Sequence, residues 1–391
     1  MLPRTHTFKL FCAVVCLTPI ISVTYLHLHA TPERGTSPSC PRTNRDISTP
    51  LDHTGTFDTS DNTVAGHMRE RRRWVEDTCK RRQFMCHFNS TLKFHLFPFH
   101  EFNATVCTIA KAGSSTWRSH LRRVNLGPPS HLPIAVDARR HALLSRPQHD
   151  ALEAIRATVN ILTVRHPLTR LVSCFRNKYK AGNPLPPHRP EWERRRRKCP
   201  KDPIDGVDAA SPSQKMAGAS WADKFHQFWL PALFSNDLVP KDLHVAIGLS
   251  TPINPDVRYD SWVYEQIHSR LRPRVGFVQF LRHVVATHRG GRPDGHWSQY
   301  HKDCCPCLLR YSFVTRVETL TEDLAHVFGV LGIPSDPSVS LNRIRKSYDD
   351  PYKELRYYRK VPLAIRKELY EYIKTDLEMF NYHLPPGFLE K

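Results

Sequence analysis

A strand–turn–helix pattern that occurs twice is the feature that most constrains how this chain folds. In the first copy the β-branched apolar run 104–110 leads into the small-residue turn KAGSST (111–116), and helical spacing follows. In the second copy the run 158–164 has the composition of a buried strand, and 168–179 has the pattern of an amphipathic helix. Two such units predict an α/β fold with a central parallel sheet and flanking helices.

Further elements extend this prediction toward the C-terminus. Residues 310–317 alternate in the manner of a strand and lead into a helix that should begin with a capping box, Thr319 to Glu322, and end at Gly332. The last helix, from about Pro362, places its apolar side chains on one stripe, which indicates packing rather than chemistry.

The N-terminus carries an uncharged stretch of residues, 10–26, preceded by Arg4 and Lys9. This length is near the lower limit for a membrane-spanning helix, so a cleaved signal peptide is the alternative to an anchor. The basic flank predicts a cytosolic N-terminus with the body of the protein in the lumen. We therefore expect a cytosolic tail, a transmembrane signal-anchor, a flexible stem and a lumenal domain, with the bounds 1–9, 10–28, 29–78 and 79–391.

The charge balance is strongly one-sided. There are 57 Lys and Arg residues against 37 Asp and Glu, which gives a formal net charge of +20. A basic surface attracts nucleic acid, anionic lipid, a phosphorylated cofactor or an acidic polysaccharide alike. A lumenal location excludes nucleic acid and favours an acidic glycan, and the sequons at Asn89 and Asn103 agree with that location as sites for N-glycans. The Pro-rich basic segment 184–212 is expected to form an exposed loop that shapes the acceptor site.

Eleven cysteines make the redox compartment important. Cys304-Cys305-Pro306-Cys307 offers three thiols, which raises the question of zinc, but a tetrahedral site needs a further ligand at suitable spacing. In an oxidising lumen disulfides are the default, and they are the favoured interpretation. A local pair between Cys79 and Cys86 is one hypothesis for the pairing.

The turn KAGSST has the character of an anion-binding site. A small-residue turn between a strand and a helix leaves backbone N–H groups free, and the helix dipole adds to the attraction. Lys111 stands first in this turn, unlike the P-loop of nucleotide hydrolases, in which the lysine comes near the end. From that position its ammonium can reach the bridging oxygen of a leaving group.

The second unit offers a matching pair of side chains. Arg165 ends the strand, and Ser173 lies about two helical turns further on, so both can converge on one anion at the carboxyl edge of the sheet. A bidentate arginine suits a terminal phosphate. The alternative is that Arg165 pairs with a carboxylate and Ser173 only packs within its helix.

Five stretches, in order, carry a resemblance that no single motif would establish. They are TIAKAGSSTW (108–117), ILTVRHPLTRLVSCFRNKY (161–179), VGFVQFLRHVV (275–285), HWSQYHKDCCPCLLRYSFVTRVETLTED (296–323) and ELYEYIKTDLEMFNYH (368–383). The chain resembles the Golgi carbohydrate sulfotransferases of the chondroitin and dermatan 4-O, N-acetylgalactosamine 4-O and glucuronyl 3-O group. It departs from that family at Ala110, where Pro is usual, and at Thr116, where Asn is usual, which puts the affinity for the cofactor in question.

The resemblance implies a donor, an acceptor and a location. The donor is 3′-phosphoadenosine 5′-phosphosulfate (PAPS), with the first stretch holding its 5′-phosphosulfate and the second its 3′-phosphate. The acceptor is a glycan hydroxyl, first of all the 4-hydroxyl of N-acetylgalactosamine in chondroitin or dermatan, and the location is the Golgi membrane. The implied cofactor-binding residues are Ala110, Lys111, Ala112, Gly113, Ser114, Ser115, Thr116, Arg165, His166, Pro167, Leu168, Thr169, Arg170, Leu171, Val172 and Ser173.

Sulfuryl transfer needs no metal, because positioned cations at the leaving phosphate and a base at the attacking hydroxyl are sufficient. Lys111 is the candidate for stabilising the charge. His296, in the His-Trp pair that the resemblance highlights, is the first candidate for the base, and His166, next to Arg165, is the second. Because the chain has 23 histidines, a structural or substrate-binding role for either is the competing interpretation.

Three other functions fit parts of the pattern. A Golgi glycosyltransferase would share the anchor and stem, but many such enzymes use an Asp-x-Asp motif, which this sequence lacks. A lumenal kinase would need the P-loop order and metal-binding carboxylates. A basic lumenal protein that binds sulfated glycans without modifying them needs only charge, and turnover of PAPS separates it from an enzyme.

Overall fold

The computed structural model describes residues 63–82, 84, 86–126, 140–179, 221–334 and 353–390. All of them lie in Asp58–Lys391, one of the two compact units of the chain. The predicted tail, the anchor at 10–28, the stem up to residue 62 and the basic segment 184–212 lie outside the described residues. Within the described ranges, no helix combines the length and the apolar character needed to cross a membrane.

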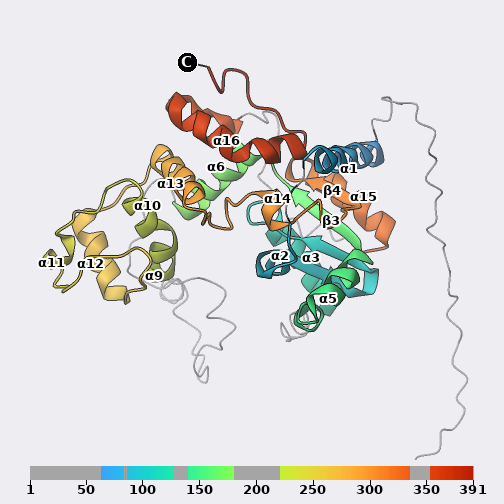
Figure 1. Cartoon of the computed structure of the whole chain (residues 1–391), viewed down its shortest axis with the longest axis horizontal. Helices are drawn as coiled ribbons and strands as arrows, with labels where there is room; N and C mark the ends of the chain where they lie inside the picture. Colours follow the sequence, from blue (N-terminus) through green and yellow to red (C-terminus); the bar gives the residue numbers. More distant parts are fainter. Residues whose placement is uncertain are drawn as a thin grey trace, which may run out of the picture. The chain divides into compact units, whose positions relative to one another are not determined.

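The described chain contains helices and strands (Figure 1), among them the 3-10 helices η1, η4 and η6 and the π-helix η3. In chain order they are α1 (Val64–Arg81), α2 (Ser90–His95), β1 (Leu96–Phe99), η1 (His100–Phe102), β2 (Ala104–Cys107), α3 (Ser114–Leu126), α5 (Gln148–Arg156), β3 (Val159–Val164), α6 (Pro167–Lys178), α9 (Trp221–Lys224), η3 (Phe225–Trp229), α10 (Leu230–Phe234), α11 (Leu243–Ala246), α12 (Ser261–Leu271), α13 (Phe277–Arg289), α14 (Tyr300–Asp303), β4 (Phe313–Arg316), η4 (Val317–Thr319), α15 (Leu320–Leu331), η6 (Lys353–Lys360) and α16 (Leu363–Met379).

The four strands form one sheet in the order β1-β2-β3-β4. β2 pairs with β3, and β3 with β4, in parallel, as the strand–turn–helix pattern predicts. β1 pairs antiparallel with β2, so the sheet is mixed and the prediction of a parallel sheet holds for three of its strands. An antiparallel neighbour needs no crossover helix, and only the short η1 separates β1 from β2.

Helices cover both faces of the sheet. On one face Ile161 of β3 belongs to the same apolar cluster as Trp117 of α3 and Phe328 of α15. On the other face Leu162 of β3 clusters with Ile155 of α5. A strand that is buried on both sides has no reason to alternate polar and apolar residues, which explains the mostly apolar sequence of β3.

A third apolar cluster contains side chains of α6, α10, α12, α13 and α16. The stripe predicted for the last helix contributes to it, because Leu369, Ile373 and Leu377 are all buried. Helix α6 adds Leu168 and Phe175 to the same cluster. The helix that follows Arg165 is therefore fixed by apolar packing along its length.

Helix α1 begins inside the range expected to be stem. Met68 and Val75 are buried, and Arg71 forms an ion pair with Asp323 of α15 at 2.6 Å. The side chains of the pair are only 9% and 2% exposed, so the helix is docked through a charge pair removed from water. The folded body therefore includes residues 64–78.

Helix α15 starts differently from the prediction and ends as predicted. The Thr319 hydroxyl makes no capping bond, because it donates to Asp323 at 3.0 Å and accepts from Arg71 at 3.2 Å, so the expected capping box is wrong. Gly332 ends the helix with a φ of 68°, a left-handed conformation that glycine adopts at low cost.

Two disulfides join parts of the chain that are far apart in sequence, Cys79 to Cys307 and Cys107 to Cys304. The disulfide interpretation of segment 304–307 is confirmed for two of its three thiols. The hypothesis that Cys79 pairs with Cys86 is wrong, because both disulfides instead reach across the fold to this one segment.

Candidate functional site

The turn after β2 presents the first candidate, Lys111. Its φ is 68°, a left-handed conformation that is uncommon for a residue with a side chain. Gly113 follows with a φ of 74°, and a Cβ there would lie 3.3 Å from Cδ2 of Leu320. Both the conformation and the close approach favour glycine, so the turn is held in one shape at the start of α3.

Residues 114–116 form the first turn of α3. The N–H groups of a first turn have no acceptor within the helix, and the helix dipole makes this end positive. Ser114 is half-buried and Ser115 is exposed, whereas Thr116 is buried. The turn and the helix start together present anion-binding groups at the carboxyl edge of the parallel strands, where α/β proteins bind ligands.

The Lys111 ammonium donates a hydrogen bond to Oδ1 of Asn177 on α6 at 2.6 Å. Burial lowers the pKa of Lys111 to about 8, and the nearby Lys178 and Arg165 charges act in the same direction. In the described part of the chain its hydrogen-bond partner is thus a neutral amide. With a pKa of about 8, the ammonium is still mostly charged at neutral pH, and its charge is available for an anion.

His296 lies between α13 and α14 and is oriented by Asp294. The ring Nδ1 is 2.7 Å from Oδ1 of Asp294, and the same oxygen accepts from the His296 backbone N–H at 2.8 Å. Burial lowers the pKa of His296, although the Asp294 carboxylate opposes that effect. Donation from Nδ1 leaves Nε2 with a lone pair, and among the described residues Nε2 has no hydrogen-bond partner. A neutral imidazole oriented in this way can act as a general base.

The π-helix η3 contacts this His–Asp pair. Gln227 Nε2 donates to Oδ2 of Asp294 at 3.2 Å, and the Phe228 ring meets the His296 ring edge to face with centroids 5.3 Å apart. The Lys178 ammonium lies 4.3 Å from the centroid of the same Phe228 ring. π-helical turns are frequent at functional sites, and this one supplies a second hydrogen bond to the carboxylate that orients the histidine.

Lys111 and His296 are 185 positions apart in the sequence, and the fold brings them within electrostatic reach of each other. The charges of Lys178 and Lys111 both contribute to lowering the pKa of His296. Sequence reasoning missed Asp294, Gln227 and Lys178. The two-residue spacing of Asp294 and His296 was a usable signal, whereas nothing near Gln227 pointed to the site.

Arg170 fixes the two parts of the site relative to each other. Its Nε donates to the carbonyl of Ala110 at 3.0 Å, Nη1 to that of Ser298 at 2.5 Å, and Nη2 to that of Gly295 at 3.1 Å. The guanidinium is buried and lies 4.6 Å from the centroid of the Tyr300 ring. All three nitrogens are therefore engaged with backbone. This arginine holds the turn 110–116 beside the loop between α13 and α14 that carries His296, here called the histidine loop.

Arg165 is paired with a carboxylate. Its Nη2 is 2.7 Å from Oε2 of Glu354 on η6, and its Nε donates to Oγ1 of Thr169 at 3.1 Å. The Glu354 carboxylate also accepts from Nη1 of Arg176 at 3.3 Å. Ser173 is half-buried on α6 and has no hydrogen-bond partner within the described residues.

His166 caps α6 and has both ring nitrogens engaged. Nδ1 accepts from the backbone N–H of Leu168 at 3.2 Å, and Nε2 is 2.9 Å from the carbonyl of His383. Nε2 must therefore carry the ring proton, because a carbonyl can only accept. No nitrogen remains to take a proton from a substrate, so the geometry favours His296 over His166 as the base.

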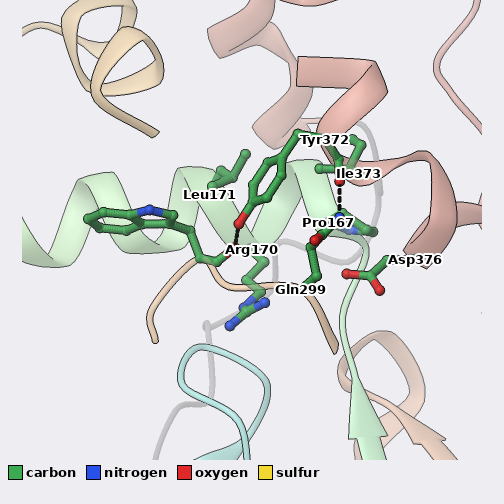
Figure 2. A pocket seen from close by; sticks show the side chains of 8 residues that line it. Pro167, Arg170, Leu171, Gln299, Tyr372, Ile373 and Asp376 are labelled. Atoms are coloured by element: carbon green, nitrogen blue, oxygen red, sulfur yellow. Dashed lines mark hydrogen bonds between the residues drawn. The ribbon is translucent and has the colours of Figure 1, made fainter. Parts of the chain in front are cut away.

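The remaining predicted cofactor residues on α6 are buried: Pro167, Leu168, Leu171 and Val172. Figure 2 shows Pro167 and Leu171 beside Gln299 and Tyr372, where they line a small pocket. Its free volume of about 10 Å³ is close to that of one water molecule, so it is too small for a nucleotide or a sugar.

The described residues contain no group of three or more His, Cys, Asp or Glu side chains placed to hold a metal ion.

Comparison with known proteins gives the family context. The model of the sulfotransferase family matches residues 94–383. The chain is 23% identical to carbohydrate sulfotransferase 9 of Homo sapiens over 328 residues, which are 81% of this chain and 60% of that protein. It is 24% identical to carbohydrate sulfotransferase 12 of Xenopus laevis over 265 residues, 66% of this chain and 48% of that protein. The chain thus spans about half to three-fifths of the length of these relatives. No solved structure matches it significantly.

Proposed function

This chain belongs to the sulfotransferase family, and we propose that it transfers a sulfuryl group from PAPS to a hydroxyl of a glycan. The observation that carries the proposal is that Arg170 bonds the carbonyl of Ala110, next to Lys111, and that of Gly295, between Asp294 and His296, so that the lysine and the His296–Asp294 pair are held near each other. The relatives named carbohydrate sulfotransferase support the choice of a glycan as acceptor.

The residues of the site fit this donor. Gly113 lets the turn 110–116 pack closely against Leu320, and the backbone N–H groups at the start of α3 have no acceptor within the helix, so they are available to a phosphosulfate. When bound, PAPS supplies a sulfuryl group attached to a phosphate leaving group. We assign the 5′-phosphosulfate to this turn and the 3′-phosphate to Arg165 and Ser173.

Lys111 stabilises the negative charge that develops on the leaving phosphate. Its ammonium is positioned by the amide oxygen of Asn177 at 2.6 Å, which orients the charge without neutralising it. A fixed cation in a partly buried site stabilises developing charge far better than a mobile one in water.

His296 takes the proton of the attacking hydroxyl on Nε2. Asp294 holds the ring through Nδ1 and stabilises the imidazolium that forms, and Gln227 holds Asp294 in turn. Arg170 bonds both the turn and the histidine loop and so fixes their relative position. The base and the leaving-group cation can therefore act on the same bound substrate.

We propose an acidic glycan as the acceptor, with the 4-hydroxyl of N-acetylgalactosamine in chondroitin or dermatan first. The net charge of +20 supports an acidic polymer.

We also propose a Golgi location, with the segment 10–28 as a type II anchor. Asn89 and Asn103 are exposed, as acceptors for N-glycans must be.

Transfer of labelled sulfate from radiolabelled PAPS tests the proposal, with desulfated chondroitin, dermatan, heparan and simple N-acetylgalactosaminides as acceptors. We expect incorporation into chondroitin or dermatan. Incorporation into another glycan alone would keep the reaction and correct the acceptor. No incorporation, together with no binding of adenosine 3′,5′-bisphosphate, would contradict the proposal and favour a basic protein that binds glycans without modifying them.

A further inference from the structure

One carboxylate lies between two arginines beside α6. Oε2 of Glu354 is 2.7 Å from Nη2 of Arg165, and Oε1 is 3.3 Å from Nη1 of Arg176. The Arg165 and Glu354 side chains are 12% and 19% exposed, so this contact is largely removed from water. Bridging two guanidinium groups with separate oxygens is also how a phosphate is commonly bound by arginines.

Arg176 shares a helix face with the residues assigned to the 3′-phosphate. Thr169, Ser173 and Arg176 are spaced four and three residues apart, which places them one above another on α6. Thr169 accepts a hydrogen bond from Arg165, so the end of β3 lies beside the Thr169 end of this row of side chains. The Glu354 carboxylate reaches the same row from η6, which packs against α6.

We propose that Arg176 is a further residue of the 3′-phosphate site and that the Glu354 carboxylate occupies this site until the donor displaces it. This inference rests on the function proposed above and adds to it a binding residue and an internal competitor.

The charges favour displacement over binding side by side. A phosphate monoester carries close to two negative charges at neutral pH, which two guanidinium groups neutralise. If Glu354 stayed in place, the site would hold one negative charge in excess, at short range and in a partly buried position. Without the donor, the carboxylate serves the opposite purpose, since it prevents two neighbouring cations from being left unpaired.

Glu354 can leave without unfolding of η6. The residues after it are anchored: Leu355 and Tyr358 are buried, and the Tyr358 hydroxyl donates to the carbonyl of Leu168 at 2.9 Å. The Tyr358 ring also meets Phe277 edge to face, with centroids 5.1 Å apart. Because the anchor lies beyond Glu354 in η6, a change of one side-chain rotamer is sufficient to open the site.

Calorimetric titration of the wild-type chain and Glu354→Gln tests the competition, with two nucleotides as probes. Adenosine 3′,5′-bisphosphate carries the 3′-phosphate, and adenosine 5′-phosphosulfate lacks it. We expect Glu354→Gln to bind the bisphosphate about tenfold more tightly, because the competing charge-assisted hydrogen bonds are lost, and to bind the phosphosulfate as the wild type does.

A matched control is Glu378→Gln. Glu378 also lies between two arginines, at 3.5 Å from Arg81 and 2.6 Å from Arg82, but outside the site. We expect its affinities for both nucleotides to equal those of the wild type.

Arg176→Gln supplies an independent variant. It should weaken binding of the bisphosphate about tenfold and leave binding of the phosphosulfate unchanged.

Unchanged or weaker binding of the bisphosphate by Glu354→Gln would overturn the displacement, since Glu354 would then serve to orient Arg165. A wild-type chain that binds neither nucleotide would contradict the proposed function itself, and the inference would fall with it.

Discussion

Lys111 and His296 must hold opposite protonation states at the same pH, the lysine charged and the histidine neutral. Burial lowers the pKa of Lys111 to about 8, and burial also lowers the pKa of His296 from its ordinary value. Because the pKa of His296 is lowered as well, a pH range remains between the two pKa values. In that range the base is free to accept a proton while the cation is still charged.

The pH dependence of kcat/KM follows from these shifts. It should rise as His296 loses its proton, at a pH below the ordinary histidine value of about 6.5, and fall above about 8 as Lys111 loses its own. Initial rates of sulfate transfer across pH measure both limbs. Lys111→Arg is the control, because an arginine stays charged and should remove the fall above about 8; a wild-type rate that stays level above that pH would contradict the assignment of Lys111.

Replacing the base should separate turnover from binding. His296→Asn is expected to lower kcat by about 10²–10⁴-fold, because the other candidate base, His166, has both ring nitrogens engaged, while the affinity for adenosine 3′,5′-bisphosphate stays unchanged. Steady-state rates and calorimetry give the two values. His149→Asn, at an exposed position on α5, should change neither. A normal kcat in His296→Asn would move the base to another residue.

At the scale of elements, α6 serves both ends of the proposed donor site. At its C-terminal end, Asn177 bonds Lys111, and Lys178 lies over the Phe228 ring that contacts His296. The row of side chains from Thr169 to Arg176 contacts Arg165 and Glu354. The buried side of the same helix belongs to the apolar cluster shared with α16. One rigid helix therefore sets the distance between the two anion-binding regions.

The docking of α1 gives a prediction about stability. Arg71→Ala leaves the Asp323 carboxylate buried without its charged partner, which should cost about 3–5 kcal/mol of unfolding free energy. Chemical denaturation measures the loss. Lys80→Ala, in an exposed pair with Asp77 on the same helix, should change the unfolding free energy by less than about 1 kcal/mol. Equal losses in the two variants would show that α1 is not fixed by this pair.

The sequence predicted those elements whose formation depends on neighbouring residues in the chain. β2, β3 and β4 and the helices after them follow from apolar runs and turn residues. β1 was not predicted, since its sequence LFPF is short and contains a proline, and its place is set by pairing with β2. The capping box at Thr319 failed for a related reason, because the buried Arg71–Asp323 pair engages the threonine hydroxyl.

Half of the candidate site could be found in the same way. Lys111 and Arg165 stand at strand ends, where a parallel sheet collects ligands, so their position follows from the pattern alone. Asp294 and Gln227 come from a loop and a π-helix that tertiary packing brings together. Glu354 is further still from any motif, and no local rule predicts that its carboxylate reaches Arg165.

At the scale of the whole molecule, two disulfides connect the segment 304–307 to α1 and to the end of β2. The loop that carries His296 leads through α14 into this segment. Cross-links of this kind restrict the unfolded chain, and they also tie the histidine loop to the sheet edge that carries Lys111.

Removing the Cys107–Cys304 disulfide should therefore affect stability and activity together. Cys304→Ser is expected to lower the unfolding free energy by about 2–5 kcal/mol and to reduce sulfate transfer. Thermal unfolding and initial rates measure the two effects. Cys86→Ser keeps both disulfides, since Cys86 is a free thiol, and should retain the wild-type rate. Full stability in Cys304→Ser would show that the disulfide does not support the fold.

The most direct measurement is the rate of labelled sulfate transfer from PAPS to desulfated dermatan by the wild-type chain, Lys111→Ala and Arg165→Ala, with folding of each variant checked by thermal unfolding. We predict transfer by the wild type and a loss of at least about 10²-fold in each folded variant, because the leaving-group cation or the 3′-phosphate contact is gone. Transfer at the wild-type rate by both variants would contradict the assignment of this site to sulfuryl transfer.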